Sequence, residues 1–140
     1  MTTGYLLDTN VVSETRKREP DTQVMEWVES VHGPSLYLST LVVGEVRYGA
    51  ERLRRRDSRQ AEFIDAWLDA LYRDFRDRII PVTSEVAEEW GRLRATSPLP
   101  AVDGLLAATA LVRGWTLVTR NVKDVASTGV RVVNPFEPLV

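Results

Sequence analysis

Carboxylates that follow short apolar runs are the residues of this sequence best suited to do chemistry. Asp8 comes directly after the first apolar run, and Asn121 and Asp124 follow a later one. Asp103 opens an apolar helical segment, and Glu45 lies in the helical segment after another apolar run. In an open parallel sheet, ligands bind at the carboxyl ends of the strands. We therefore expect these side chains to meet at one edge of a sheet.

Glu45 is the most informative of these residues. At about 100° per residue it falls between Val42, Val46 and Gly49, on the stripe of its helix that should face the core. Arg47 points elsewhere, so a carboxylate buried there needs another cation. Oxygen ligands, in a chain with no cysteine and a single histidine, suit Mg²⁺ or Mn²⁺ rather than Zn²⁺. The residue types therefore predict a site for a hard divalent metal.

Each acid also has a purely structural explanation. Asp8 and Asp103 could be turn or N-cap residues, Asp124 a solvated loop acid, and Glu45 a side chain that extends to water. A shared acidic site accounts for all four residues at once, and we take it as the working hypothesis.

Short apolar runs alternate with helical patterns along the whole chain. The runs are of strand length, and several are too uniformly apolar to have one face in water. Between them, large apolar residues recur at helical spacing. This alternation predicts an α/β sandwich with about five parallel strands. The strands are expected at residues 4–7, 36–38, 79–82, 115–119 and 130–133.

Two of the predicted helices have unusual features. The segment 57–78 is long, and we expect it to protrude. The segment 103–113 has no charge between its ends and is apolar nearly all round, so it should be buried. The expected helix ends are N-caps at Thr40, at Thr83 or Ser84 and at Asp103, and a stop at Gly114.

The composition limits the number of domains and the kinds of partner that we expect. The chain has 140 residues, 44% of them apolar, and we expect a single domain over residues 1–140. A net charge of -2 gives no global positive field for nucleic acid or an anionic membrane, so any RNA contact must be local. The arginines at 52 and 54–56 are interpreted first as a solvated face. With no basic leader or apolar span in view, we expect a cytoplasmic protein without membrane contact.

Four short segments resemble the motifs of a known family. They are Leu6-Leu-Asp8-Thr-Asn10, Leu38-Ser-Thr-Leu-Val-Val-Gly-Glu45, Asp103-Gly-Leu-Leu-Ala-Ala-Thr109 and Leu117-Val-Thr-Arg-Asn121-Val-Lys-Asp124. In this order, the segments resemble the four motifs of PIN-domain nucleases, in particular toxins of VapC type from bacterial toxin-antitoxin pairs. Each segment alone is a weak signal, but the resemblance covers essentially the whole chain.

The resemblance implies a fold, an activity and partners. The fold is a three-layer, PIN-like α/β sandwich whose parallel sheet has the strand order 3-2-1-4-5. The activity is that of an Mg²⁺- or Mn²⁺-dependent endoribonuclease, a hydrolase that cuts RNA with metal-activated water. The partners are the RNA substrate, a cognate antitoxin of a type II toxin-antitoxin system and a second copy of the chain in a homodimer.

The resemblance also assigns roles by position. Asp8, Glu45 and Asp103 match the three acids that hold the metal, and Asn121 matches a fourth catalytic position that is often aspartate. This departure removes one negative charge from the expected site. The positions that match polar residues supporting the acids are Thr9, Asn10, Thr119 and Asp124.

Two other functions fit parts of the pattern. A non-catalytic module that binds RNA or protein would keep the fold but would have no use for buried acids that cost stability. A phospho-acceptor receiver domain resembles the chain in its small sheet, but such domains have paired acids after the first strand and a lysine near the end of the fifth. Here Leu7 precedes Asp8, and no lysine follows residues 130–133.

Overall fold

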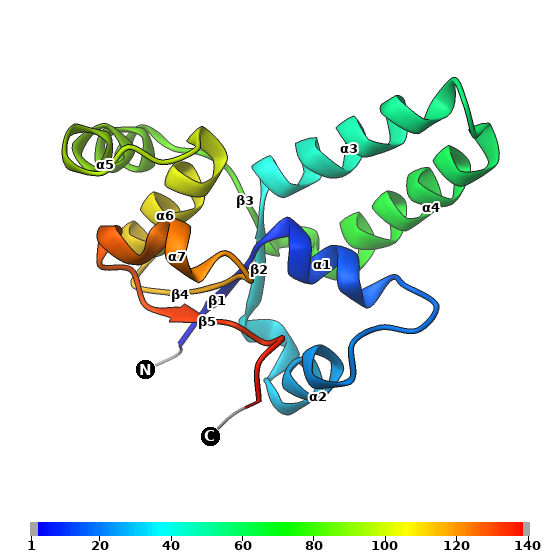
Figure 1. Cartoon of the computed structure of the whole chain (residues 1–140), viewed down its shortest axis with the longest axis horizontal. Helices are drawn as coiled ribbons and strands as arrows, with labels where there is room; N and C mark the ends of the chain where they lie inside the picture. The colour runs from blue at the N-terminus through cyan, green and yellow to red at the C-terminus, as the bar shows by residue number, and fades with distance from the viewer. Residues whose placement is uncertain (1–2, 139–140) are drawn as a thin grey trace.

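The computed structural model describes residues 3–138. Its centre is a parallel sheet in the order β3-β2-β1-β4-β5 (Figure 1), which confirms the order that the resemblance implies. The five predicted runs supply the strands, with ends that differ from the predicted ones by up to two residues. The strands are β1 (Tyr5–Leu7), β2 (Leu36–Ser39), β3 (Ile79–Ile80), β4 (Thr116–Val118) and β5 (Val132–Val133).

Strand β1 lies at the centre of the sheet, between β2 and β4. Tyr5 is level with Leu36 on one side and with Thr116 on the other. Leu6 and Leu117 are buried, because helices cover both faces of the sheet. All the strands run in one direction, so their carboxyl ends meet at a single edge.

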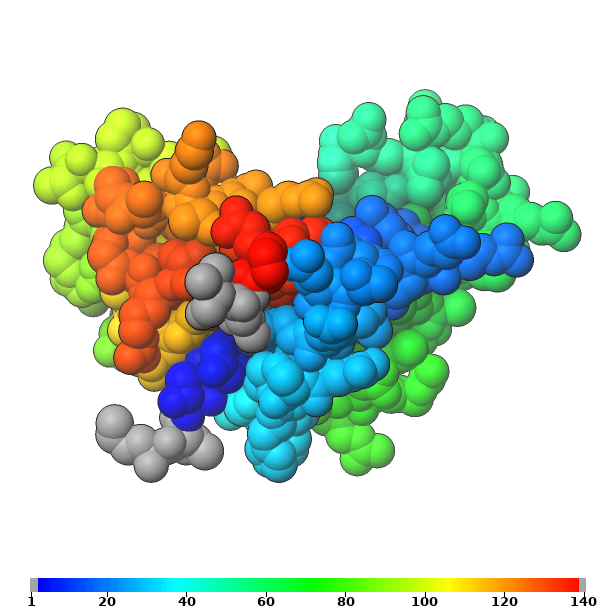
Figure 2. Space-filling view, turned by 60° about the horizontal axis from the view of Figure 1, so that its bottom comes forward, coloured from blue at the N-terminus to red at the C-terminus, as the bar shows by residue number. Residues whose placement is uncertain are grey.

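The helices are placed so that two groups flank this edge. Helices α5, α6 and α7 lie on one side of the view and α3 and α4 on the other, with the carboxyl ends of β1 and β2 between them (Figure 1). Figure 2 shows a notch between the two groups in the space-filling view. The helices are α1 (Thr9–Thr15), α2 (Thr22–Ser30), α3 (Thr40–Arg54), α4 (Ser58–Phe75), α5 (Ser84–Thr96), α6 (Ala101–Arg113) and α7 (Val122–Val125).

Helices α3 and α4 form a hairpin that extends away from the sheet (Figure 1), which confirms the predicted protrusion. Asp65 on α4 accepts from Arg47 at 2.6 Å and from Arg54 at 2.9 Å, and Glu51 accepts from the same two arginines at 3.3 and 2.7 Å. Each of these ion pairs is partly exposed and stabilises little by itself. Together they tie the two helices to each other.

Two predicted helix boundaries are wrong by a short distance. Helix α4 ends at Phe75 instead of Arg78, because Arg76 has a φ of 37°, which a right-handed helix cannot contain. The N-cap of α3 is Ser39 rather than Thr40, and its hydroxyl accepts a hydrogen bond from the second helical residue at 3.0 Å.

Helix α6 is buried as predicted, but it begins earlier. It starts after Pro100, so Asp103 is the third residue of the helix and the predicted N-cap is wrong. Proline has no backbone N–H and suits a helix start, which explains the earlier beginning. The predicted stop at Gly114, with a φ of 70°, and the predicted cap of α5 at Thr83 are both confirmed.

Helices α5 and α6 approach each other closely at Gly104. A Cβ atom at this position would lie 3.0 Å from Cδ1 of Trp90 on α5, tighter than ordinary van der Waals contact. Among the helices of residues 3–138, no single one is both long and apolar enough to cross a membrane, and α5 and α6 meet that test only as a pair bent by 120°.

Candidate active site

Asp8 is positioned by the end of β1 and the start of α1. It is the N-cap of α1, and its Oδ1 accepts a hydrogen bond from the backbone N–H of Thr9 at 2.7 Å. Its Oδ2 accepts from the hydroxyl of Thr119 at 2.7 Å and from the amide of Asn10 at 3.3 Å. Asp8 is only 6% exposed. Its carboxylate is therefore fixed by neutral donors from two strand ends.

A small polar network joins the ends of β1 and β4. The amide of Asn10 donates to Thr119 Oγ1 at 3.4 Å, and the backbone N–H of Asn121 donates to the same hydroxyl oxygen at 3.0 Å. The backbone N–H of Arg120 donates to Asn10 Oδ1 at 3.3 Å. Asn10 and Thr119 thus contact Asp8 and one another, as expected for residues that support an acid.

Glu45 lies on α3 and is exposed, so the prediction that it faces the core is wrong. The buried stripe of α3 consists of Val42, Val46 and Ala50, and Glu45 falls on the flank of this stripe at the end nearest the sheet. Its Oε1 nevertheless accepts a hydrogen bond from the hydroxyl of Thr9. Thr9, whose backbone N–H donates to Asp8, therefore links Glu45 to Asp8.

Asp103 lies in the first turn of α6, with its side chain half-buried. Burial raises the pKa of its carboxyl above the ordinary value, and the negative charges of Asp8, Asp124 and Glu45 raise it further. These three residues come from α1, α7 and α3, so four acids from distant parts of the sequence gather at the carboxyl edge of the sheet. This is the arrangement that the strand-end argument predicts.

Asn121 and Asp124 lie at the start of α7 and are exposed. The backbone N–H of Asp124 donates to the carbonyl oxygen of Asn121 at 3.2 Å. Within residues 3–138 the side chain of Asn121 makes no hydrogen bond, whereas its backbone is tied to Thr119. Asp124 thus acts on Asp103 through its charge. Asn121 is held next to the acids by its backbone, which donates to Thr119.

The chemistry of these side chains suits a hard divalent cation. The donors are carboxylate, hydroxyl and amide oxygens. Burial and, after it, repulsion by the other acids raise the pKa of Asp103, and a cation would relieve that repulsion. In the part of the chain that the structure describes, no three acidic or histidine side chains lie close enough together to hold one ion as they stand. Binding a metal therefore requires side-chain rotation, which exposed Glu45 can undergo.

One acid that matters for this region was not singled out in the sequence. Glu14 is buried at the end of α1, where it accepts from the backbone N–H of Asp21 at 2.8 Å and pairs with Lys17 at 2.9 Å. Lys17, the Asp21 N–H and the nearby charge of Arg120 lower the pKa of Glu14 despite its burial. It fixes the loop that follows α1. The sequence offered one signal for Glu14, which is its place on a short helix, six residues after Asp8.

The fold and the acids define a class of protein, a parallel α/β domain with carboxylates gathered beside its central strands. The family model for the PIN domain matches residues 5–126 of the chain. The chain therefore belongs to the PIN-domain family, as its four motifs indicate.

Two relatives are similar to the chain over nearly its whole length. A protein of Sinorhizobium fredii named VapC ribonuclease Y4jK is 32% identical over 141 residues, which cover 95% of this chain and 98% of the relative. Toxin FitB of Neisseria gonorrhoeae is 31% identical over 137 residues, which cover 94% and 97%.

Two solved structures are also similar. The crystal structure of FitAcB from Neisseria gonorrhoeae has a chain that matches with a TM-score of 0.88 and 30% identity over 96% of this chain and 99% of that one. A toxin-antitoxin complex from Klebsiella pneumoniae has a chain that matches with a TM-score of 0.69 and 27% identity over 96% and 100%. The relatives of this chain therefore include proteins named as ribonucleases and as toxins.

Proposed function

We propose that the chain is a metal-dependent endoribonuclease that acts as the toxin of a type II toxin-antitoxin system. The observation that carries the proposal is the gathering of Asp8, Glu45, Asp103 and Asp124 at one sheet edge, where burial and the charges of the other three acids raise the pKa of Asp103. Such a group costs stability unless a cation is bound. The name of the VapC ribonuclease relative supports the reaction class.

In this proposal Asp8, Glu45 and Asp103 hold Mg²⁺ or Mn²⁺. When bound, the metal makes water a stronger nucleophile and neutralises charge on the phosphate that is cut. Asp8 needs no reorganisation, since Thr119 and the Thr9 N–H already fix both its oxygens. Water can serve as the nucleophile, so no nucleophilic side chain is needed, in a chain that has no cysteine and a single histidine.

The residues around the acids would orient them rather than react. The Thr9 hydroxyl restrains Glu45, which is otherwise free in solvent. Asn10 holds Asp8 and the backbone of Arg120 together, and so keeps the start of α7 beside the site. Asn121 can offer an amide oxygen but no charge, so we assign it a weaker role than the three acids.

A cleavage assay with titrated metal tests the proposal directly. Total RNA and a mixed-sequence oligonucleotide are incubated with the protein in EDTA and then with increasing Mg²⁺ or Mn²⁺. We expect cleavage only with metal, and a loss of at least about 10²-fold in Asp8→Asn, Glu45→Gln and Asp103→Asn. Asp69→Asn, which changes an exposed aspartate on α4, is the matched control and should stay active. Full activity in EDTA would refute the metal requirement, and RNA binding without cleavage would favour the non-catalytic module.

An antitoxin partner is part of the same proposal. The Klebsiella pneumoniae structure that matches this chain is a toxin-antitoxin complex. We expect the partner of this chain to place a basic side chain, an arginine, against Asp8, Glu45 and Asp103. An apolar stretch of the partner would cover a groove beside α4. Pull-down of the product of the neighbouring reading frame tests whether that product is the partner. A partner that binds the variant with all three acids neutralised equally well, and still blocks RNA entry, would contradict the charge contact.

We also expect a homodimer and a cytoplasmic protein. Tyr48, Phe63 and Tyr72 on the hairpin are at least half exposed, and large exposed apolar side chains are available for a subunit contact. Sedimentation at micromolar concentration measures the mass. A species of 15.8 kDa would be the monomer and would contradict the dimer.

A further inference from the structure

A surface pocket adjoins the acid cluster on the side of α7. It has a volume of about 490 Å³ and is lined by residues 120–124 together with Asn134 and Glu137; we call it the α7 pocket. Asp124, which lines it, is also one of the charges that act on Asp103. The pocket and the acids therefore share a border. Its volume is in the range of sites that hold small ligands.

Arg120 is held at this border by its backbone and its side chain. Its N–H donates to Asn10 Oδ1 at 3.3 Å, and its guanidinium lies 4.0 Å from the centroid of the Phe136 ring. Phe136 is fixed in turn, because its backbone N–H donates to Asn134 Oδ1 at 3.0 Å. A planar cation over an aromatic ring is a preorganised flat surface. Unpaired RNA bases stack on arginine and aromatic surfaces of this kind.

Two cations of the α7 pocket form no ion pair with the described residues, although the charge of Arg120 acts on Glu14. Arg120 and Lys123 are exposed, and neither forms an ion pair with a carboxylate of residues 3–138. Arg47 and Arg54 of the α3–α4 hairpin differ, since both are paired with Asp65. Unpaired cations beside a nuclease site are available for the phosphates of a nucleic acid.

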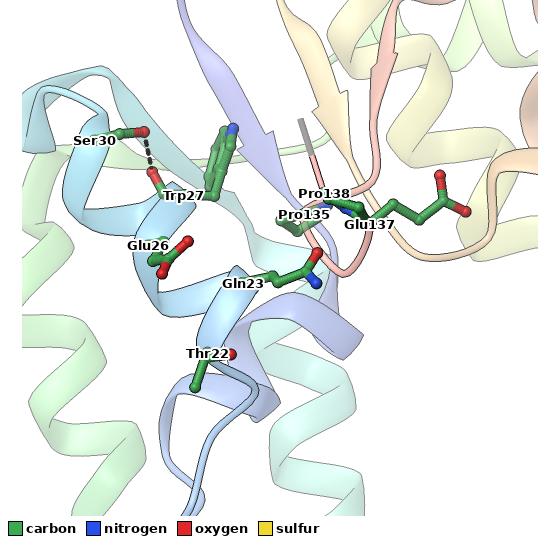
Figure 3. Close-up of a pocket in the computed structure, with 8 residues that line it drawn as sticks. All are labelled: Thr22, Gln23, Glu26, Trp27, Ser30, Pro135, Glu137 and Pro138. Atoms are coloured by element: carbon green, nitrogen blue, oxygen red, sulfur yellow. Dashed lines mark hydrogen bonds between the residues drawn. The ribbon is translucent and has the colours of Figure 1, made fainter. Parts of the chain in front are cut away.

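A second pocket shows why the α7 pocket is the better candidate for RNA. This pocket, about 530 Å³, lies between α2 and the segment 135–138 (Figure 3). The described residues that line it include Glu26 and Glu137 but no lysine or arginine. In Figure 3 the carboxylate of Glu137 extends away from α2. A cavity without a cation does not suit a polyanion, whereas the α7 pocket has two cations, Arg120 and Lys123, beside its two acids, Asp124 and Glu137.

We infer that the α7 pocket binds one nucleotide of the RNA, beside the phosphate that is cut. Lys123 contacts a neighbouring phosphate, the Arg120 guanidinium held over Phe136 is the surface on which the base stacks, and Glu137 reads the edge of the base. A carboxylate accepts hydrogen bonds but does not donate them. Glu137 therefore favours the amino groups of adenine, cytosine and guanine over uracil, whose single ring N–H lies between two carbonyl oxygens. This inference rests on the proposed ribonuclease function and adds a base preference to it.

Binding measured without cleavage tests the cations. Fluorescence anisotropy with a labelled single-stranded RNA of mixed sequence, in EDTA, compares the wild type with Arg120→Ala and Lys123→Ala. Arg113→Ala is the matched control, because Arg113 is also exposed and lies over an aromatic ring, Trp115 at 5.3 Å, but at the opposite edge of the sheet.

We expect each pocket variant to bind about five- to tenfold more weakly. The slope of log affinity against log salt should fall by about 0.7 for each phosphate that a variant no longer binds. The control should bind like the wild type. No loss in the pocket variants, an equal loss in the control, or no RNA binding by the wild type would overturn the inference.

Glu137→Gln tests the reading of the base. Sequencing the products cut from a randomised RNA pool should show uridine depleted at one position beside the cut for the wild type, and this depletion should be lost in the variant. An unchanged profile would overturn the role of Glu137. If no metal-dependent cleavage occurs but the pocket variants lose binding, the nuclease proposal fails and the pocket stands. If cleavage occurs and binding is unchanged, the reverse holds.

Discussion

The Asp103→Asn substitution removes one charge from a group of four carboxylates, and it should stabilise the metal-free protein. Burial and the charges of Asp8, Asp124 and Glu45 all raise the pKa of Asp103. For two unit charges about 7 Å apart in a medium with a dielectric constant of about 80, Coulomb's law gives a repulsion of about 0.6 kcal/mol, which we take as the scale for each pair. Three neighbours give about 2 kcal/mol, which salt screening reduces to about 1 kcal/mol. We therefore expect the free energy of unfolding to rise by about 0.5 to 2 kcal/mol at pH 7.

The gain should depend on pH in one direction only. Below the ordinary aspartate pKa, Asp103 is protonated in both the folded and the unfolded protein, so the substitution changes little. As pH rises through the raised folded pKa, the wild type must ionise a carboxyl that the fold disfavours, and its stability falls relative to the variant. The difference is complete at neutral pH.

Urea unfolding in EDTA at several pH values between 4 and 8 measures this difference, with Asp69→Asn as the exposed control on α4. Adding Mn²⁺ should stabilise the wild type more than Asp103→Asn, because only the wild type keeps all three proposed ligands. A variant no more stable than the wild type at pH 7, or a gain of the same size at pH 4, would refute the assignment of Asp103 to a group of repelling acids.

Substitutions at three further positions, one of them with a matched control at Gly91, test the surroundings of the acids. Thr119→Val removes the hydroxyl that donates to Asp8 at 2.7 Å. We expect the free energy of unfolding in urea to fall by about 1–3 kcal/mol and cleavage to be at least tenfold slower. Wild-type stability and rate would contradict the network. Gly104→Ala forces a Cβ against the facing indole and should cost about 1–3 kcal/mol, whereas Gly91→Ala, which meets nothing within 4 Å, should not. Asn121→Ala should slow cleavage about tenfold. Asn121→Asp should bind Mn²⁺ more tightly in calorimetry and should melt at a lower temperature in EDTA. If Asn121→Asp melts like the wild type and binds Mn²⁺ with the same affinity, position 121 lies outside the site.

The strands and the place of Asp8 could be predicted because both depend on local sequence. A run such as residues 4–7 has no polar face, and that alone requires a buried strand of a parallel sheet. An acid that directly follows such a run must lie at the carboxyl edge. The same reasoning correctly places the acid of α6 near that edge, although the helix begins at Ala101.

The error at Glu45 arose because helical spacing does not distinguish the centre of a buried stripe from its edge. Glu45 is about 60° from Val42 and about 100° from Val46, so spacing alone permits either a core or a flank position. The end of α3 near the sheet edge is also open to solvent. Which of the two positions applies depends on what packs against α3, and that partner is α4, which comes later in the chain.

The α7 pocket could not be predicted from the sequence, for a different reason. Phe136 and Glu137 follow a proline in a segment without helical or strand periodicity, so nothing local predicts that they return to residues 120–124. The stacking of Arg120 on Phe136 is a contact between irregular segments. Such contacts depend on the path of the loops, which hydrophobic periodicity does not encode.

The hydrogen bond from Thr119 to Asp8 joins residues that are 111 positions apart in the chain. During translation the N-terminal segment leaves the ribosome first. A growing chain that has not yet released β4 already carries Asp8, Glu45 and Asp103, but it lacks one of the two strands that pair with β1 and the hydroxyl that orients the first acid. The acid cluster is therefore completed only after β4 has been made. The proposed antitoxin, if it is made at the same time and place, has the whole of that interval in which to arrive.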